Sequence, residues 1–311
     1  MPHEREPRLV AARPRNDEWC WLLTAVLTAF ALLAALIYFE PPVARGATLT
    51  ASERAEQQIA AFLLTKEEDV ALVGSSLFHR LAPEYFLSHK VTNLALAGDS
   101  PLTGLAIVAS ASRPPPKLLV VEANVMDRFL NPSLVSKLSS IDSAAGGIAF
   151  FASNVRPVRL ATALLYPSGV NATRRAQILA QPVASTDIGP SVAGIEAAWS
   201  KRQFRAAAER NIALALGYAE QIERRGGKVL FVFQPYAAAL MKHPYATETI
   251  AMWQQQIASL PHRWLEVDVD ADKLRFTDGA HLDERSAILY IEALERTLRE
   301  QEVPRIPQSG R

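Results

Sequence analysis

The chain has 311 residues, of which 33 are basic and 32 acidic, and 49% are hydrophobic. This length suits one large domain or two small ones, and the apolar content allows a sizeable core. The balanced charge excludes the broad basic surface on which nucleic-acid binding depends, so no nucleic-acid partner is expected. A single cysteine, Cys20, excludes an internal disulfide and any metal site built on several thiolates.

The first expected element is a transmembrane helix from Trp19 to Phe39. These 21 residues carry no charge. At 1.5 Å per residue the helix would span roughly 30 Å, the thickness of a bilayer core. Four arginines precede the segment and only Arg45 follows it closely, which predicts a cytoplasmic N-terminus and an exported remainder. The alternative is a signal peptide that is cleaved near residues 44–46.

The rest of the chain divides around this helix. Residues 1–18 form an N-terminal tail, and residues 40–51 form a linker that begins with a Glu-Pro-Pro helix break. Residues 52–302 are expected to form one domain, followed by a C-terminal tail at 303–311.

Short apolar runs and helical segments alternate within this domain. The runs that predict buried strands are Val70–Val73, Val91–Ala97, Leu118–Val121, Val229–Phe233 and Trp264–Val267. The segments with helical spacing are Ser52–Lys66, Leu102–Ser112, Ile195–Arg225, Glu248–Leu260 and Arg285–Gln301. This alternation predicts an α/β fold of three layers, with helices on both faces of a mostly parallel sheet of about five strands. The stretch 126–190 is less regular, and is either an insertion that shapes a substrate cleft or a set of weakly patterned helices.

Polar residues follow the first three runs, where ligand sites form in such sheets. Ser76 comes after Gly74 and Ser75, at the expected start of a helix, where its hydroxyl could act as a nucleophile. Gly98 follows the second run and leaves room for a substrate oxygen near its backbone N–H. Asn124 follows the third run, and its amide can donate to the same oxygen. Each of these residue types is also common in turns and helix caps.

Asp278 and His281 are three residues apart at the junction between a loop and the last helical segment. A carboxylate bonded to an imidazole fixes its tautomer and stabilises its protonated form, as a general base requires. The alternative is a turn aspartate followed by a surface histidine. No His/Asp/Glu cluster predicts a metal site and no glycine-rich loop predicts a nucleotide site, so no cofactor is expected.

In their order along the chain, these blocks resemble those of the SGNH (GDSL-type) hydrolase superfamily. The resemblance covers roughly Val70 to Glu295. In that family the blocks supply a nucleophile, two further oxyanion-hole donors and an Asp–His pair on a flavodoxin-like sheet. The resemblance therefore implies a triad of Ser76, Asp278 and His281, and an oxyanion hole of Ser76, Gly98 and Asn124.

Two positions depart from the family pattern, and one triplet offers an alternative nucleophile. Ser75 replaces the aspartate of the first block, as it often does in the membrane-tethered branch of the family. Glu122 replaces the glycine of the third block; an acid–base role is the alternative, and we interpret it as a solvated loop carboxylate. Residues 98–100 spell Gly-Asp-Ser, which makes Ser100 the alternative nucleophile. Ser76 is preferred because the glycine and asparagine blocks then follow it in order.

The chain is similar in particular to the exported, membrane-tethered branch, which acts in polysaccharide O-acetylation and teichoic acid D-alanylation. This implies a serine-dependent acyl-ester enzyme in the bacterial inner membrane, with a single membrane helix and its catalytic domain in the periplasm or outside the cell. The implied substrate is a polysaccharide or acylated sugar, and the implied partner is a multi-spanning membrane acyltransferase. Acyl transfer and hydrolysis both remain open. The alternative function is a non-catalytic domain of the same fold that binds glycans or serves as a scaffold subunit of a membrane acylation complex.

Overall fold

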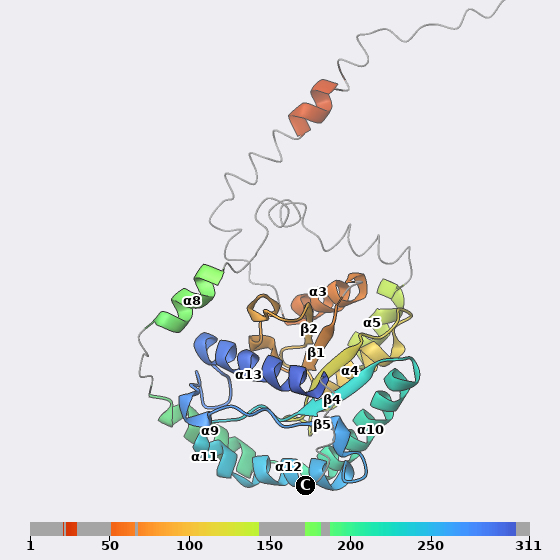
Figure 1. The fold of residues 1–311 in the computed structure, drawn as a ribbon. Coiled ribbons are helices and arrows are strands. Elements are labelled where there is room, and N and C mark those ends of the chain that lie inside the picture. The colour runs from red at the N-terminus through yellow and green to blue at the C-terminus, as the bar shows by residue number, and fades with distance from the viewer. Residues whose placement is uncertain are drawn as a thin grey trace, which may run out of the picture. The chain divides into compact units, whose positions relative to one another are not determined.

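The computed structural model describes residues 21, 23–29, 51–65, 68–142, 172–181 and 187–302. The chain divides into two units, one of Met1–Thr48 and Val155–Pro167, and one of Leu49–Asn154 and Ser168–Arg311. Of the first unit, only residues 21 and 23–29 are described, and they are helical. In the second unit, strands and helices alternate along the chain (Figure 1).

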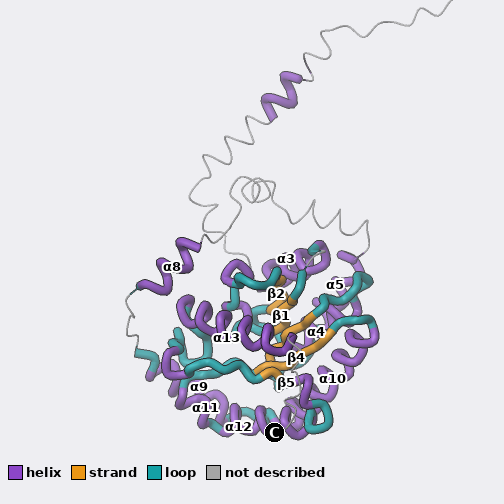
Figure 2. The backbone as a smooth tube through the Cα atoms, viewed as in Figure 1, coloured by secondary structure: helices purple, strands orange, loops and turns teal. Residues whose placement is uncertain are grey.

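The strands of the second unit form one parallel sheet with the order β2-β1-β3-β4-β5. Their bounds are Val70–Gly74 (β1), Val91–Ala95 (β2), Leu118–Glu122 (β3), Lys228–Val232 (β4) and Trp264–Leu265 (β5). Every residue of β1 and β3 is buried, as expected for central strands covered on both faces. Figure 2 shows the strands with helices around them. The predicted α/β fold with five parallel strands is confirmed.

Helices connect and flank these strands. The described α-helices of this unit are α3 (Ala51–Leu64), α4 (Pro101–Ser110), α5 (Pro132–Asp142), α8 (Ala172–Ala180), α9 (Gly189–Ser200), α10 (Arg205–Arg224), α11 (Ala238–Lys242), α12 (Pro244–Gln256) and α13 (Glu284–Glu302). Four short 3-10 helices accompany them: η1 (Phe78–Arg80), η2 (Pro83–Tyr85), η3 (Pro261–Arg263) and η4 (Ala271–Lys273).

Alternate side chains of the strands enter two different hydrophobic cores. Ala71 and Val73 belong to a core shared with side chains of α3, α4, α10 and α12. Val70 and Leu72, on the opposite face of the same strand, belong to a second core with α13. Figure 1 shows α13 lying across the strands. The arrangement is consistent with three layers, in which helices cover both faces of the sheet.

The segment Ile195–Arg225, which the spacing predicts as one helix, forms two helices instead. α9 ends at Ser200 and α10 begins at Arg205. The rings of Trp199 and Phe204 both contact Tyr245, with centroid distances of 4.5 and 4.8 Å. In a continuous helix, two residues five apart would point about 140° away from each other. The break lets both rings pack on the same tyrosine, a tertiary contact that local spacing does not reveal.

Several predicted segments fall largely outside the described residues. Among the residues that the structure describes, no helix has the length and apolar character needed to cross a bilayer. The membrane helix predicted at 19–39 is mostly outside that set and stays a prediction, as do the tails at 1–18 and 303–311 and most of the linker at 40–51. Within the irregular stretch 126–190, the described residues include α5 and α8.

The strand order determines where a site can form. From β1 the chain continues to β2 on one side, while β3 lies on the other side of β1. Connections therefore diverge between β1 and β3, and ligands of open α/β sheets bind at such a point, beyond the carboxyl ends of the strands. Ser76 follows β1 and Asn124 follows β3, so two predicted site residues come from the two strands that flank this point.

Candidate active site

The turn after β1 carries Ser76. Gly74 ends the strand, and a Cβ atom there would lie 2.6 Å from Phe78 Cβ and 2.7 Å from Glu122 Oε2, so only glycine fits. Ser75 is fully buried, whereas Ser76 is partly exposed. The predicted helix after the serine is only the three-residue η1, and the chain turns again at η2, which begins with Pro83. A dipole from a long helix therefore does not act on Ser76.

His281 lies between Ser76 and Asp278. His281 Nε2 is 2.9 Å from Ser76 Oγ, and His281 Nδ1 is 2.7 Å from Asp278 Oδ2. Because the carboxylate accepts a hydrogen bond from Nδ1–H, Nε2 is the ring atom that can accept the hydroxyl proton of Ser76. The structure thus brings together the three residues that the sequence suggests for a triad, although Ser76 and His281 are 205 positions apart.

The loop around Asp278 fixes the orientation of its carboxylate. Asp278 Oδ1 accepts hydrogen bonds from the backbone N–H groups of Ala280 at 2.9 Å and His281 at 2.8 Å. Partial burial by itself would raise the pKa of Asp278, but the hydrogen bonds from His281 and Ala280 outweigh it and hold the pKa below its ordinary value. Asp278 is therefore ionised at neutral pH and can stabilise a protonated imidazole.

The Asp-x-x-His loop is packed against α9. Gly279 has a φ of 97°, which disfavours other residues, and a Cβ atom there would lie 2.6 Å from Val192 Cγ2. Val192 belongs to α9, which begins at the end of the irregular stretch 126–190. α9, most of which follows that stretch, therefore supports the loop that carries His281.

The two other predicted oxyanion donors follow β2 and β3. Gly98 is exposed and has a φ of 93°. Asn124 is fully buried and pairs with the backbone of Gln234: Nδ2 donates to its carbonyl oxygen at 2.7 Å, and Oδ1 accepts from its N–H at 2.8 Å. This pairing occupies one of the two amide hydrogens of Asn124, and the amide also interacts with the side chain of Tyr236. The roles of Gly98 and Asn124 stay predictions.

Ser100, the alternative nucleophile, occupies a helix cap. It is fully buried, and its Oγ accepts a hydrogen bond from the N–H of Leu102 at 3.2 Å at the start of α4. Substrate cannot reach a hydroxyl that is enclosed in this way. Its geometry is that of a structural N-cap, whereas Ser76 is partly exposed and hydrogen-bonded to a histidine.

The interpretation of Glu122 as a solvated loop carboxylate is wrong. Glu122 is the last residue of β3 and is fully buried. Its Oε2 accepts from the N–H of Ser75 at 2.7 Å, and Ser75 Oγ lies 2.8 and 2.9 Å from its two carboxylate oxygens. Burial raises the pKa of Glu122 to about 7, although the hydrogen bonds from Ser75 oppose the rise. A carboxylate directly after four apolar strand residues was the signal that could have identified it.

Sequence reasoning also missed three buried polar residues, of which two interact electrostatically with Glu122 and one pairs with Asn124. Gln234 and Tyr236 follow β4, and Tyr290 lies on α13. Burial raises the pKa of both tyrosines well above its ordinary value, and the charge of Glu122 raises it further. These residues come from distant parts of the chain, and no local spacing in the sequence marks them.

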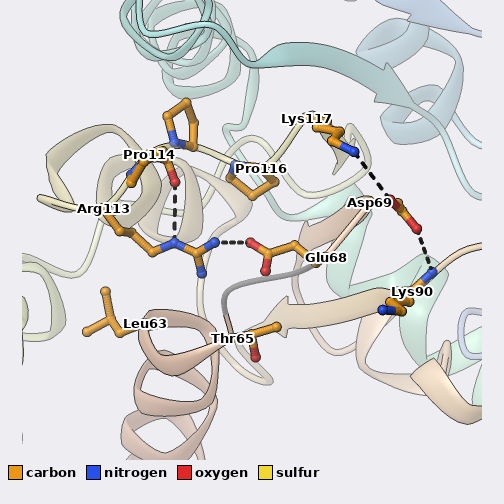
Figure 3. A pocket seen from close by; sticks show the side chains of 10 residues that line it. Leu63, Thr65, Glu68, Asp69, Lys90, Arg113, Pro114, Pro116 and Lys117 are labelled. Carbon is orange, nitrogen blue, oxygen red and sulfur yellow. Dashed lines mark hydrogen bonds and ion pairs between the residues drawn. The ribbon is translucent and has the colours of Figure 1, made fainter.

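A cavity of about 700 Å³ lies at the opposite edge of the sheet, where the strands begin. In Figure 3 the Arg113 guanidinium points to Glu68, and the Lys117 amine points to Asp69. The cavity contains none of the predicted site residues. Arg113 pairs with Glu68 and Lys117 with Asp69, and no histidine lines this cavity, so we place the candidate site at the triad.

Comparison of the chain with protein-family models, curated proteins and solved structures finds no match in any of the three. The resemblance to the SGNH superfamily is therefore carried by the residues quoted above. Among the described residues, no group of three or more His, Cys, Asp or Glu side chains is arranged to hold a metal ion.

Proposed function

We propose that the protein is a serine-dependent acyl-ester enzyme of the SGNH type. The observation that carries this proposal is the hydrogen-bonded chain from Asp278 through His281 to Ser76. Its position beyond the carboxyl ends of the strands, and a sheet order that matches flavodoxin-like folds, support the same assignment.

In the proposed first step, His281 Nε2 takes the proton of Ser76 while Ser76 Oγ attacks the carbonyl carbon of an ester. Asp278 holds the imidazole through Nδ1 and stabilises the imidazolium that forms. His281 then gives the proton to the departing alcohol, which leaves an acyl group on Ser76. The N–H groups of Ser76 and Gly98 and the Asn124 amide are the proposed donors to the oxyanion, and one such donor is typically worth ~10²–10³ in rate.

In the second step, an acceptor hydroxyl loses its proton to His281 and attacks the carbonyl carbon of the acyl group. The bond from that carbon to Ser76 Oγ then breaks, and His281 returns the proton to Ser76 Oγ. Water as the acceptor gives hydrolysis, and a sugar hydroxyl gives transfer. We favour a cell-surface polysaccharide or acylated sugar as the substrate, with a multi-spanning membrane acyltransferase as the partner that supplies acyl groups. The proposed membrane helix at 19–39 would keep the domain near that partner and raise its effective concentration.

Labelling with an aryl fluorophosphonate tests the proposal on the full-length protein in detergent. The probe should attach to Ser76 and add its phosphonyl mass, as measured by intact-mass and peptide spectrometry. Ser76→Ala should lower both labelling and p-nitrophenyl acetate hydrolysis at least ~10³-fold. Ser100→Ala is the matched control, because it removes a neighbouring hydroxyl that is buried in a helix cap, and it should label like the parent.

Equal labelling of the parent and Ser76→Ala would contradict the proposal. A folded parent that neither labels nor hydrolyses the ester would favour the non-catalytic glycan-binding or scaffold alternative. Once labelling is established, adding oligosaccharides to the acetyl ester reaction separates transfer from hydrolysis, since only transfer yields an acetylated sugar.

A further inference from the structure

We infer that Glu122 is a positioning residue that fixes the nucleophile turn, so that Ser76 Oγ faces His281 Nε2. The inference rests on the proposed function, because it concerns how Ser76 is presented for reaction. It departs from the family pattern on which that function is based, since the corresponding position in the wider family is glycine.

Glu122 is hydrogen-bonded to the residue directly before the nucleophile. The N–H of Ser75 donates to Oε2 at 2.7 Å, and the hydroxyl of Ser75 is within 2.9 Å of both carboxylate oxygens. The same hydroxyl accepts from the N–H of Leu77 at 3.3 Å. Ser75 and Leu77 flank Ser76, so the carboxylate restrains the residue before the nucleophile directly and the residue after it through the Ser75 hydroxyl.

The Glu122 carboxylate connects this turn to the central strand β3. Glu122 ends β3, which pairs with β1 up to Val121 opposite Val73, directly before the turn. Its side chain fills the space that Gly74 leaves open. A side chain supported by a central strand holds a reacting group more rigidly than a loop contact can. Displacement of a reacting atom by about 1 Å can cost ~10² in rate.

The charged and titratable groups around Glu122 come from several elements. Arg128 lies after β3, Tyr236 after β4 and Tyr290 on α13, and each interacts electrostatically with the carboxylate. Burial raises the pKa of Glu122 to about 7, so both protonation forms are present near neutral pH. The ionised form can accept every hydrogen bond from the turn, whereas the protonated form loses part of its acceptor capacity. Its hold on the turn should therefore strengthen as the pH rises through 7.

Glu295 offers a matched control for a purely structural carboxylate. It is also buried, and it accepts backbone hydrogen bonds from Leu87 at 3.0 Å and Ser88 at 2.6 Å. It lies on α13 and holds a loop that contains none of the proposed catalytic residues. Loss of this carboxylate should affect folding without moving Ser76.

The experiment compares Glu122→Gln, Glu122→Ala, Ser75→Ala and Glu295→Gln with the parent. It measures the fluorophosphonate labelling rate, kcat and KM for p-nitrophenyl acetate, and thermal unfolding. Glu122→Ala should lower kcat ~10²-fold and Ser75→Ala ~10-fold, each with little change in KM. Glu122→Gln keeps the shape and one acceptor oxygen, so it should recover part of the loss. The parent's kcat advantage over Glu122→Gln should grow between pH 6 and 8. Glu295→Gln should lower the unfolding temperature and leave kcat unchanged.

The outcomes separate this inference from the proposed function. Labelling of the parent at Ser76 tests the function alone, and its absence would overturn that function. Suppose that the parent labels at Ser76 and that folded Glu122→Gln and Ser75→Ala label as fast as the parent. The positioning role is then wrong, while the proposed function stands. Should Glu122→Ala fail to fold, these two variants, which remove less volume, still decide the question.

Discussion

Charged residues lie at two opposite edges of the sheet, one where the strands begin and one where they end, and they make different kinds of interaction. At the edge where the strands begin, Glu68 is paired with Arg113, and Asp69 lies 3.7 Å from Lys117 (Figure 3). At the carboxyl edge, one hydrogen-bonded chain runs from Asp278 through His281 and ends at the partly exposed hydroxyl of Ser76. At the first edge, these acidic and basic side chains form ion pairs with each other. At the second edge, the chain of hydrogen bonds ends at a hydroxyl that we propose as the nucleophile.

A buried carboxylate lies at each edge, and the two differ in the groups that contact them. The side chain of Glu68 is only 1% exposed, and its opposite charge is supplied by Arg113. Glu122 is equally buried but receives neutral donors from Ser75, and burial raises its pKa to about 7. A buried charge that loses its partner destabilises the fold, while a carboxylate with a perturbed pKa beside a candidate nucleophile points to a functional site. Variants at the two edges should therefore affect different measurements.

The largest effect is expected from Asp278→Asn. An amide cannot stabilise the imidazolium and favours the wrong tautomer of His281, so kcat should fall ~10³–10⁴-fold while the protein stays folded. Asp270→Asn is the control, because Asp270 makes an aspartate turn and an ion pair with Lys273 at the same spacing of three residues. Steady-state hydrolysis of p-nitrophenyl acetate measures both. Equal rates for the two variants would show that the Asp278–His281 bond does not serve catalysis.

The next largest effect should appear at the other edge, in stability. Glu68→Ala leaves the Arg113 guanidinium, whose side chain is 16% exposed, without its carboxylate partner. We expect the free energy of unfolding to fall by ~3 kcal/mol in denaturant titrations. The rate of Ser76 labelling should remain within about twofold of the parent, because this edge takes no part in the chemistry. A large loss of labelling without loss of stability would contradict the prediction that this edge affects stability and not reactivity.

Local patterns in the sequence predict most of the fold and name the three residues that the structure brings together in the proposed triad. β1 follows from an apolar run, and the Asp278–His281 spacing is short enough to read directly. What the sequence misses depends on contacts between distant segments. The break before Phe204 exists because two rings share Tyr245, and Glu122 is buried because β3 pairs with β1. Neither partner can be located from the neighbours of the residue itself.

A pH-dependent effect on stability, at most as large as that of Glu68→Ala, is expected from Glu122. Its folded-state pKa of about 7 lies above the ordinary value of 4.5, so the folded chain binds this proton more tightly than the unfolded chain does. The resulting stability is fully present below about pH 4.5 and is lost as the pH rises through 7. At ~1.4 kcal/mol per pKa unit, the parent should lose up to ~3 kcal/mol relative to Glu122→Gln. Unfolding titrations of both proteins from pH 4.5 to 8 measure this, and a constant difference would contradict the raised pKa.

The smallest effect should come from Ser100→Ala, at the carboxyl edge but outside the reacting chain. Loss of the Oγ that accepts from Leu102 should lower the free energy of unfolding by ~1 kcal/mol, as is typical for an N-cap. Labelling at Ser76 should not change, because Ser100 contacts the start of α4 and is enclosed there. A stability loss with intact labelling would show that proximity to the active edge is not enough for function. Loss of labelling without loss of stability would instead return Ser100 to consideration as the nucleophile.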